Sequence, residues 1–91
     1  MSAATDRGRQ SDFLKALAHP VRLRMVRGLL SRRECNVGAM ARSLGVPQST
    51  ASQHLRILKN CGIVAFRKEG ARTCYHIADG RVRGIMAALG G

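Results

Sequence analysis

Residues 48–60, QSTASQHLRILKN, combine hydroxyl, amide and guanidinium side chains and contain no acidic residue. At about 100° per helical residue, Leu55 and Leu58 lie within about 40° of Ala51, whereas Gln53 and Arg56 lie on the opposite side. Amide and guanidinium groups bind the edges of adenine and guanine, or phosphate. The spacing therefore predicts a helix with a face that reads nucleic acid, made of Gln48, Ser49, Thr50, Ser52, Gln53, His54 and Arg56.

This face also has a less specific interpretation. Serine, glutamine and arginine side chains on an arbitrary helix usually do no more than face solvent. His54 projects about 60° from the apolar centre of the helix, so a packing role fits its position at least as well as a DNA contact. The positive charge of the surrounding sequence favours nucleic-acid binding over a merely solvated face.

A second cluster of charge follows this helix. Residues 63–68 and 72–77 have the alternation of strands, and Glu69-Gly70-Ala71 separates them. The tip of the predicted hairpin gathers three like charges, which would not stabilise a purely structural turn. Contact with phosphate or with the minor groove would explain them. The residues concerned are Arg67, Lys68 and Arg72.

The composition bounds the class of protein. The 91 residues include 16 Lys+Arg and 5 Asp+Glu, a net charge of +11, and 45% are hydrophobic, which together predict one small basic globular domain with a polyanionic partner. No apolar run approaches the roughly 18 residues that cross a bilayer, so we expect a cytoplasmic protein with no membrane partner. Five scattered carboxylates and no nucleophile-base set give no support for an enzyme.

Hydrophobic periodicity places these residues on a short series of elements. The first ten residues show no periodicity and are expected to form a flexible arm, with a single domain at 11–91. Asn36 and Asp79 are expected to cap helices, and glycines to end them at 45 and 62. The expected elements are helices over about 11–19, 20–33, 37–44 and 48–60, strands over 63–68 and 72–77, and a last helix after Asp79 that ends at Gly90. The order ααααββα is mainly α with a β-hairpin wing, which is a winged helix-turn-helix.

The sequence resembles the ArsR/SmtB family of winged-helix repressors. The resemblance rests on LKALAHPVRLR at 14–24, ECNVG at 34–38 and QSTASQHL at 48–55, and it extends over about residues 11–89. One departure is Pro47, where the family often has the serine that caps the fourth helix. The resemblance implies repression of a partly palindromic double-stranded DNA operator, relieved by an inducer, and a homodimer formed through the first and last helices, with Phe13, Leu14, Leu17, Val82, Ile85, Met86 and Leu89 at the interface.

The cysteines leave the inducer open. Cys35 fits a branch of the family that includes repressors responsive to sulfide and persulfide, but their second cysteine near the final helix has no counterpart after Cys74. Cys61 resembles a cadmium- and lead-sensing cysteine, yet Ile57 stands where its companion ligand would be. The family's third-helix and last-helix metal sites are missing as well, because Asn36, Gly38 and Arg81 replace ligands. No cofactor is certain; a metal(loid), persulfide or oxidant could act at a cysteine.

Spacing limits the pairing of these thiols. If the hairpin turns around Gly70, Cys74 lies opposite Phe66 and roughly 16 Å from Cys61, which is too far for a disulfide. Cys35 could pair with Cys61 or Cys74, within or between chains. Each cysteine alone could equally be a small apolar side chain, and Cys35 is the best candidate for a reactive thiol because Arg32 and Arg33 precede it.

The sequence thus predicts a sequence-specific DNA-binding transcriptional regulator, a homodimeric repressor released by a thiol-reactive or metal(loid) inducer. The alternative is a basic nucleoid or RNA-binding protein with no inducer. The only aromatic residues, Phe13, Phe66 and Tyr75, form no stacking platform, which disfavours single-stranded RNA. The inducer, the operator and the regulated genes stay undetermined.

Overall fold

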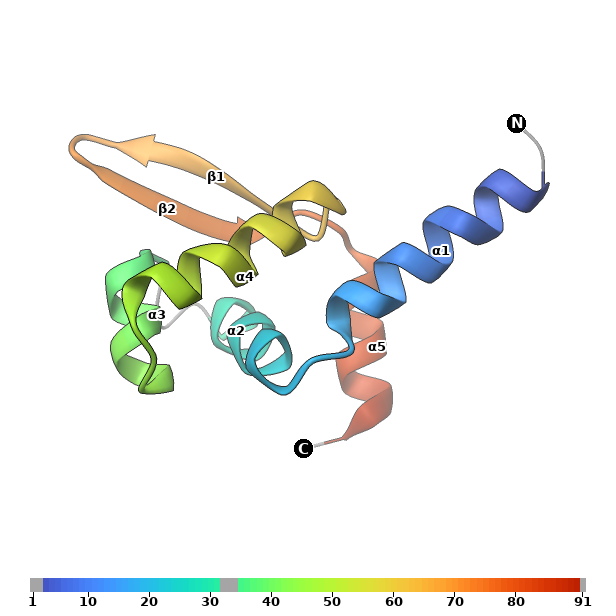
Figure 1. The fold of residues 1–91 in the computed structure, drawn as a ribbon, viewed down its shortest axis with the longest axis horizontal. Coiled ribbons are helices and arrows are strands. Elements are labelled where there is room, and N and C mark those ends of the chain that lie inside the picture. Colours follow the sequence, from blue (N-terminus) through green and yellow to red (C-terminus); the bar gives the residue numbers. More distant parts are fainter. Residues whose placement is uncertain (1–2, 32–34, 91) are drawn as a thin grey trace.

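The computed structural model of the chain describes residues 3–31 and 35–90. Its elements follow the expected order, four helices, a two-stranded antiparallel hairpin and a last helix (Figure 1). The winged helix-turn-helix prediction is therefore confirmed. The elements are α1 Ala3–Leu17, α2 Pro20–Leu30, α3 Val37–Leu44, α4 Gln48–Asn60, β1 Val64–Glu69, β2 Arg72–Ile77 and α5 Arg81–Leu89.

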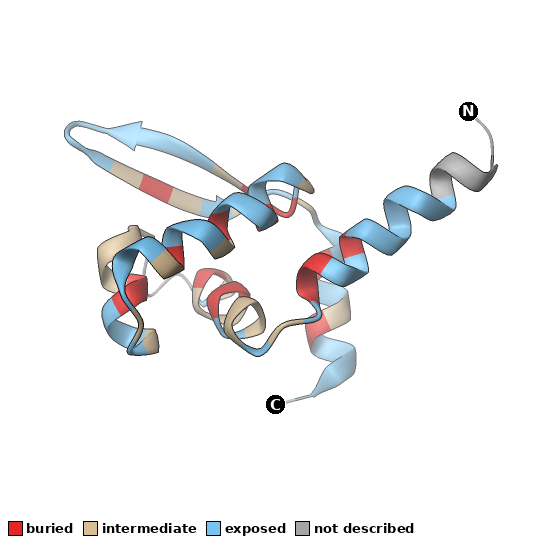
Figure 2. Cartoon of the chain, in the orientation of Figure 1, coloured by how far each residue is buried: buried red, intermediate tan, exposed pale blue. Residues whose placement is uncertain are grey.

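The core lies where α2 and α4 meet the base of the hairpin (Figure 2). Ala51, Leu55 and Leu58 are buried, as the helical spacing of α4 predicted. They form one cluster with Val26 of α2 and Val64 of β1. Burying a side chain of this size contributes about 1.5–3 kcal/mol, so these contacts fix the side of α4 that faces inward and leave its polar side outside.

Local capping positions α3 and α4 as a helix-turn-helix. The Asn36 side chain accepts a hydrogen bond of 2.8 Å from the Ala39 amide, as expected of an N-cap. Gly45 ends α3 with a φ of 69°, a left-handed conformation that favours glycine. Pro47 precedes α4, and no side chain in the described chain caps that helix, as the proline had predicted. The conformation of the turn between α3 and α4 is therefore determined by Gly45 at the end of α3.

The hairpin differs from the expected register by one residue. Glu69 pairs with Arg72, so the turn contains two residues rather than three, and Gly70 has a φ of 64°. Cys74 consequently lies opposite Arg67, and the prediction that it lies opposite Phe66 was wrong. Because the side chains of a strand alternate, this correction places Arg67 and Cys74 on the same face of the hairpin.

The ends of three helices also differ from expectation. Helix α1 begins at Ala3, whereas residues 1–10 were expected to form an arm and the helix to start at Ser11; alanine, arginine and glutamine favour helix even without an apolar period. Helix α2 ends at Leu30 rather than near residue 33, and residues 32–34 lie outside the described part of the chain. The N-cap of α5 is Gly80, although the Asp79 carboxylate still accepts a hydrogen bond from the Arg81 amide.

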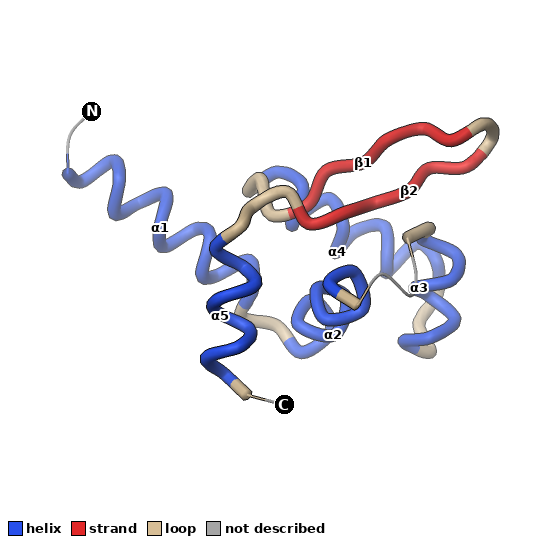
Figure 3. Tube along the Cα trace, turned by 180° about the vertical axis from the view of Figure 1, so that it is seen from behind, coloured by secondary structure: helices blue, strands red, loops and turns tan. Residues whose placement is uncertain are grey.

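Helices α1 and α5 lie at the end of the molecule opposite the tip of the hairpin (Figures 1 and 3). The Arg81 guanidinium of α5 lies 4.3 Å from the centre of the Phe13 ring of α1. The N-terminal part of α1 extends away from the other elements. In the described part of the chain, no helix combines the length and the apolar character needed to cross a membrane.

Candidate nucleic-acid interface

The outward face of α4 is polar and carries no carboxylate. Thr50 is half-buried, and the other residues of the predicted reading face are exposed apart from His54. Since the opposite face of the same helix packs into the core, the helix presents these groups as one surface. The exposed members are Gln48, Ser49, Ser52, Gln53 and Arg56.

His54 differs from its neighbours because it packs against α2 and against His19, the N-cap residue of that helix. Its Nδ1 accepts a 3.0 Å hydrogen bond from the Arg22 guanidinium, and its ring centre lies 4.6 Å from that of His19. Arg22 also donates a hydrogen bond to the Ala16 carbonyl. Burial, followed by the nearby His19 and Arg22, lowers the pKa of His54, so the neutral ring that accepts from Arg22 is favoured. These contacts favour the packing role for His54.

The tip of the wing carries exposed positive charge. Arg67, Lys68 and Arg72 are all exposed, and the structure places them within one short hairpin. Arg67 pairs with Glu69 at 2.8 Å, a contact that sequence reasoning missed. Both partners of this pair are solvent-exposed, so it holds Arg67 weakly and a phosphate could replace Glu69. Lys68 and Arg72 belong to none of the ion pairs found in residues 3–31 and 35–90.

The wing is attached to the end of α4 by an aromatic contact. The Lys59 ammonium lies 4.6 Å from the centre of the Phe66 ring, and the Phe66 and Tyr75 ring centres are 5.6 Å apart. The three side chains join α4, β1 and β2 and so connect the wing to the reading helix. Sequence reasoning missed this contact. Had the predicted hairpin been given a turn of two residues rather than three, Phe66 and Tyr75 would have been predicted as cross-strand partners.

The cysteines occupy two separate places. Cys61 is half-buried, and its sulfur lies 3.8 Å from the Asp12 carbonyl of α1. Cys35 and Cys74 instead line a common cavity, and a hydrogen bond to Cys35, followed by burial, raises the pKa of the Cys74 thiol. All three are free thiols. Within the residues described, no three His, Cys, Asp or Glu side chains gather closely enough to bind a metal ion.

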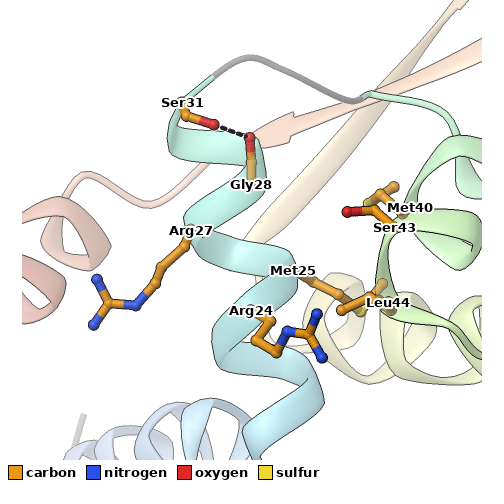
Figure 4. A pocket seen from close by; sticks show the side chains of 8 residues that line it. All are labelled: Arg24, Met25, Arg27, Gly28, Ser31, Met40, Ser43 and Leu44. Carbon is orange, nitrogen blue, oxygen red and sulfur yellow. Dashed lines mark hydrogen bonds between the residues drawn. The ribbon is translucent and has the colours of Figure 1, made fainter. Parts of the chain in front are cut away.

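The cavity between α2 and α3 offers no comparable chemistry. Its volume is about 340 Å³, and Figure 4 shows Met25 and Leu44 facing each other across it. Arg27 points to the other side of α2, where it donates a 3.0 Å hydrogen bond to the Gly90 carbonyl. The residues that line the cavity are Arg24, Met25, Arg27, Gly28, Ser31, Met40, Ser43 and Leu44. They include no histidine, cysteine or carboxylate, so this cavity has no acid-base or metal-binding set.

Comparison with known proteins assigns this arrangement to a family. Residues 19–65, from the start of α2 to the first strand, match the model for bacterial regulatory proteins of the arsR family. The chain belongs to the ArsR family. It is thus a DNA-binding transcriptional regulator of a family of repressors and not an enzyme.

Relatives extend the match along most of this ArsR-family chain. An HTH-type transcriptional regulator of Methanocaldococcus jannaschii is 40% identical over 76 residues, which are 84% of this chain and 85% of the relative. The transcriptional repressor PagR of Bacillus anthracis is 34% identical over 79 residues, 87% of this chain and 79% of PagR. A homodimeric winged helix-turn-helix DNA-binding domain of a possible ArsR-family regulator from Mycobacterium bovis has a TM-score of 0.85 at 34% identity, covering 98% of this chain and 83% of that domain.

The apolar edges predicted for the dimer interface divide into two groups. Phe13, Leu17, Val82 and Met86 are buried within a single chain, because α1 and α5 pack on the core. The other three residues are less covered. Leu14 is 56% exposed and Leu89 61% exposed, while Ile85 is half-buried, so these three remain accessible to a second ArsR-family chain.

Proposed function

We propose that this ArsR-family regulator is a homodimeric repressor that binds a partly palindromic operator sequence-specifically. The observation that carries the proposal is the carboxylate-free outer face of α4, joined to a positively charged wing through Lys59 and Phe66. A helix of this kind fits the major groove, while a basic hairpin contacts the adjacent backbone or minor groove.

The two surfaces have different roles in this proposal. The exposed polar side chains of α4 approach base edges and carry specificity, with Ser49, Ser52, Gln53 and Arg56 as the central set and Gln48 and Thr50 near the helix start. The wing contributes charge through Arg67, Lys68 and Arg72, which bind phosphate without reading sequence. His54 acts mainly by holding α4 against Arg22.

The dimer supplies the second half of the recognition surface. The homodimeric domain from Mycobacterium bovis and the exposed side chains of Leu14 and Leu89 support self-association through α1 and α5. Two copies related by a twofold axis would read two half-sites about one helical turn apart, roughly 34–36 Å. An operator of this symmetry is expected to be partly palindromic.

Repression is proposed to end when a thiol-reactive or metal(loid) inducer reacts with the protein. The shared cavity of Cys35 and Cys74 supports thiol chemistry as the trigger. Cys61 lies against α1 and is the less favoured sensor.

Selection from a library of random DNA duplexes, followed by footprinting of the selected duplex, tests the proposed function. The expected footprint has two symmetric half-sites, about one turn apart, protected by a dimer. Recovery of no common sequence would instead indicate general nucleic-acid binding by a basic protein.

A further inference from the structure

Cys35 and Cys74 come from distant parts of the sequence but are neighbours in the fold. The Tyr75 amide donates a 2.8 Å hydrogen bond to the Cys35 carbonyl, so the segment before α3 lies alongside β2. Backbones joined in this way run about 4.8 Å apart, and a disulfide requires Cα atoms within about 7 Å. The backbone spacing is therefore compatible with a disulfide between the two cysteines.

The two thiols share an accessible cavity. Its volume is about 530 Å³, and both cysteines line it together with Arg67 and Arg83. Cys35 is half-buried, whereas Cys74 is only 8% exposed. Cys35 is therefore the more exposed residue of the two, and we expect a small molecule from solvent to meet it first. Because hydrogen bonding to Cys35 and burial raise the pKa of Cys74, Cys74 remains a protonated thiol at neutral pH.

We propose that Cys35 and Cys74 are an oxidant-sensing pair, with Cys35 as the residue that reacts first and Cys74 as the residue that closes an intrachain disulfide. This inference rests on the proposed function, to which it adds the sensing site and the chemical class of the inducer, a hydroperoxide.

The reaction balances with one hydroperoxide for each disulfide. The Cys35 sulfur attacks an oxygen of ROOH and the O–O bond breaks, which gives a sulfenic acid at Cys35 and releases ROH. The Cys74 sulfur then attacks the Cys35 sulfur, so that the S–S bond forms and the S–O bond breaks. The hydroxide that leaves the Cys35 sulfur combines with the proton of the Cys74 thiol to form water. In total, two thiols are oxidised and ROOH is reduced to ROH and water.

The disulfide would act on the proposed DNA-binding surface through the wing. Arg67 pairs with Cys74 across the hairpin and lines the same cavity. A covalent bond between the sulfurs ties this part of β2 to the segment that precedes α3 at the backbone spacing already present. Since the wing must adjust to the DNA together with α4, a wing held in this way is expected to weaken operator binding about tenfold, within the usual range of coupling between sites.

Peptide mapping of the full chain tests the pairing directly. Trypsin is expected to separate the three cysteines, because they fall in peptides 34–42, 60–67 and 73–81. After treatment of the wild-type protein with hydrogen peroxide, the expected product is a disulfide between peptides 34–42 and 73–81, in a chain that migrates as a monomer on a non-reducing denaturing gel. The mapping needs no variant, so it remains decisive even where a substitution of buried Cys74 impairs folding.

Operator binding tests the consequence. Peroxide is expected to lower the affinity of wild type and of the control Cys61→Ser for the selected duplex about tenfold, and dithiothreitol to restore it. Cys35→Ser and Cys74→Ser are expected to keep their affinity under peroxide. Three free thiols after peroxide, or a bond to Cys61, would overturn the pairing, and a disulfide without loss of affinity would overturn the switch. Failure of the reduced protein to prefer the selected duplex would refute the proposed function and leave the mapping result standing.

Discussion

Removal of one charge from the wing has a calculable effect on the salt dependence of DNA binding. Lys68 is exposed, belongs to no ion pair in the part of the chain that the structure describes, and lies beside the tip of the hairpin. Each phosphate contact contributes about −0.9 to the slope of log K against log salt concentration. A dimer carries two wings, so Lys68→Ala is expected to make the slope less negative by about 1.8.

That change in slope is large enough to measure. Between 50 and 200 mM salt, a difference of about 1.8 in slope changes the ratio of the two affinities about tenfold. Fluorescence anisotropy with the selected duplex at several salt concentrations provides both slopes. The matched control is Lys15→Ala, which removes the same charge from an exposed position of α1. An unchanged slope for Lys68→Ala, or an equal change for Lys15→Ala, would refute the assignment of phosphate contact to the wing.

Three further predictions concern α4. Gln53→Ala is expected to reduce discrimination against single-base substitutions in the operator by about 1–3 kcal/mol while leaving non-specific binding almost unchanged; competition with substituted duplexes measures this, and full retention of discrimination would exclude base reading by Gln53. Leu55→Ala is expected to lower the free energy of unfolding in urea by about 2–5 kcal/mol, because Leu55 is almost completely buried, and a smaller loss would contradict its place in the core. Because the pKa of His54 is lowered in the folded chain, its contribution to stability is present above the ordinary pKa of 6.5 and is lost as the pH falls through the folded-state value. Urea unfolding at pH 5 and 7.5 should therefore show a smaller pH dependence for His54→Gln than for wild type, and equal pH dependence would contradict the assignment.

The helix-turn-helix could be predicted because its signals are local. Asn36 and Gly45 mark the two ends of α3 through conformational preferences that depend on few neighbours. The inward side of α4 followed in the same way from the spacing of Ala51, Leu55 and Leu58. Short-range rules of capping and periodicity were sufficient for this part of the fold and for the residues of its exposed face.

The parts that were missed depend on contacts between distant segments or on weak local preferences. The register of the hairpin depends on whether its turn has two or three residues, and one residue decides the partner of Cys74. Whether Cys35 lies near Cys61 or near Cys74 was left open from the sequence, because the answer depends on the segment before α3 lying along β2. The first residues of α1, from Ala3 onward, show no apolar periodicity, so only their weak helix propensity could have predicted that the helix begins there.

The most direct test of sequence-specific recognition is the ratio of two dissociation constants at physiological salt. The reduced 91-residue chain is titrated with the selected duplex and with an unrelated duplex of equal length. Specific recognition by α4 and the wing predicts binding to the selected duplex at least about 10³-fold tighter. A ratio near one would contradict it and would leave the positive charge of this chain as a general affinity for nucleic acid.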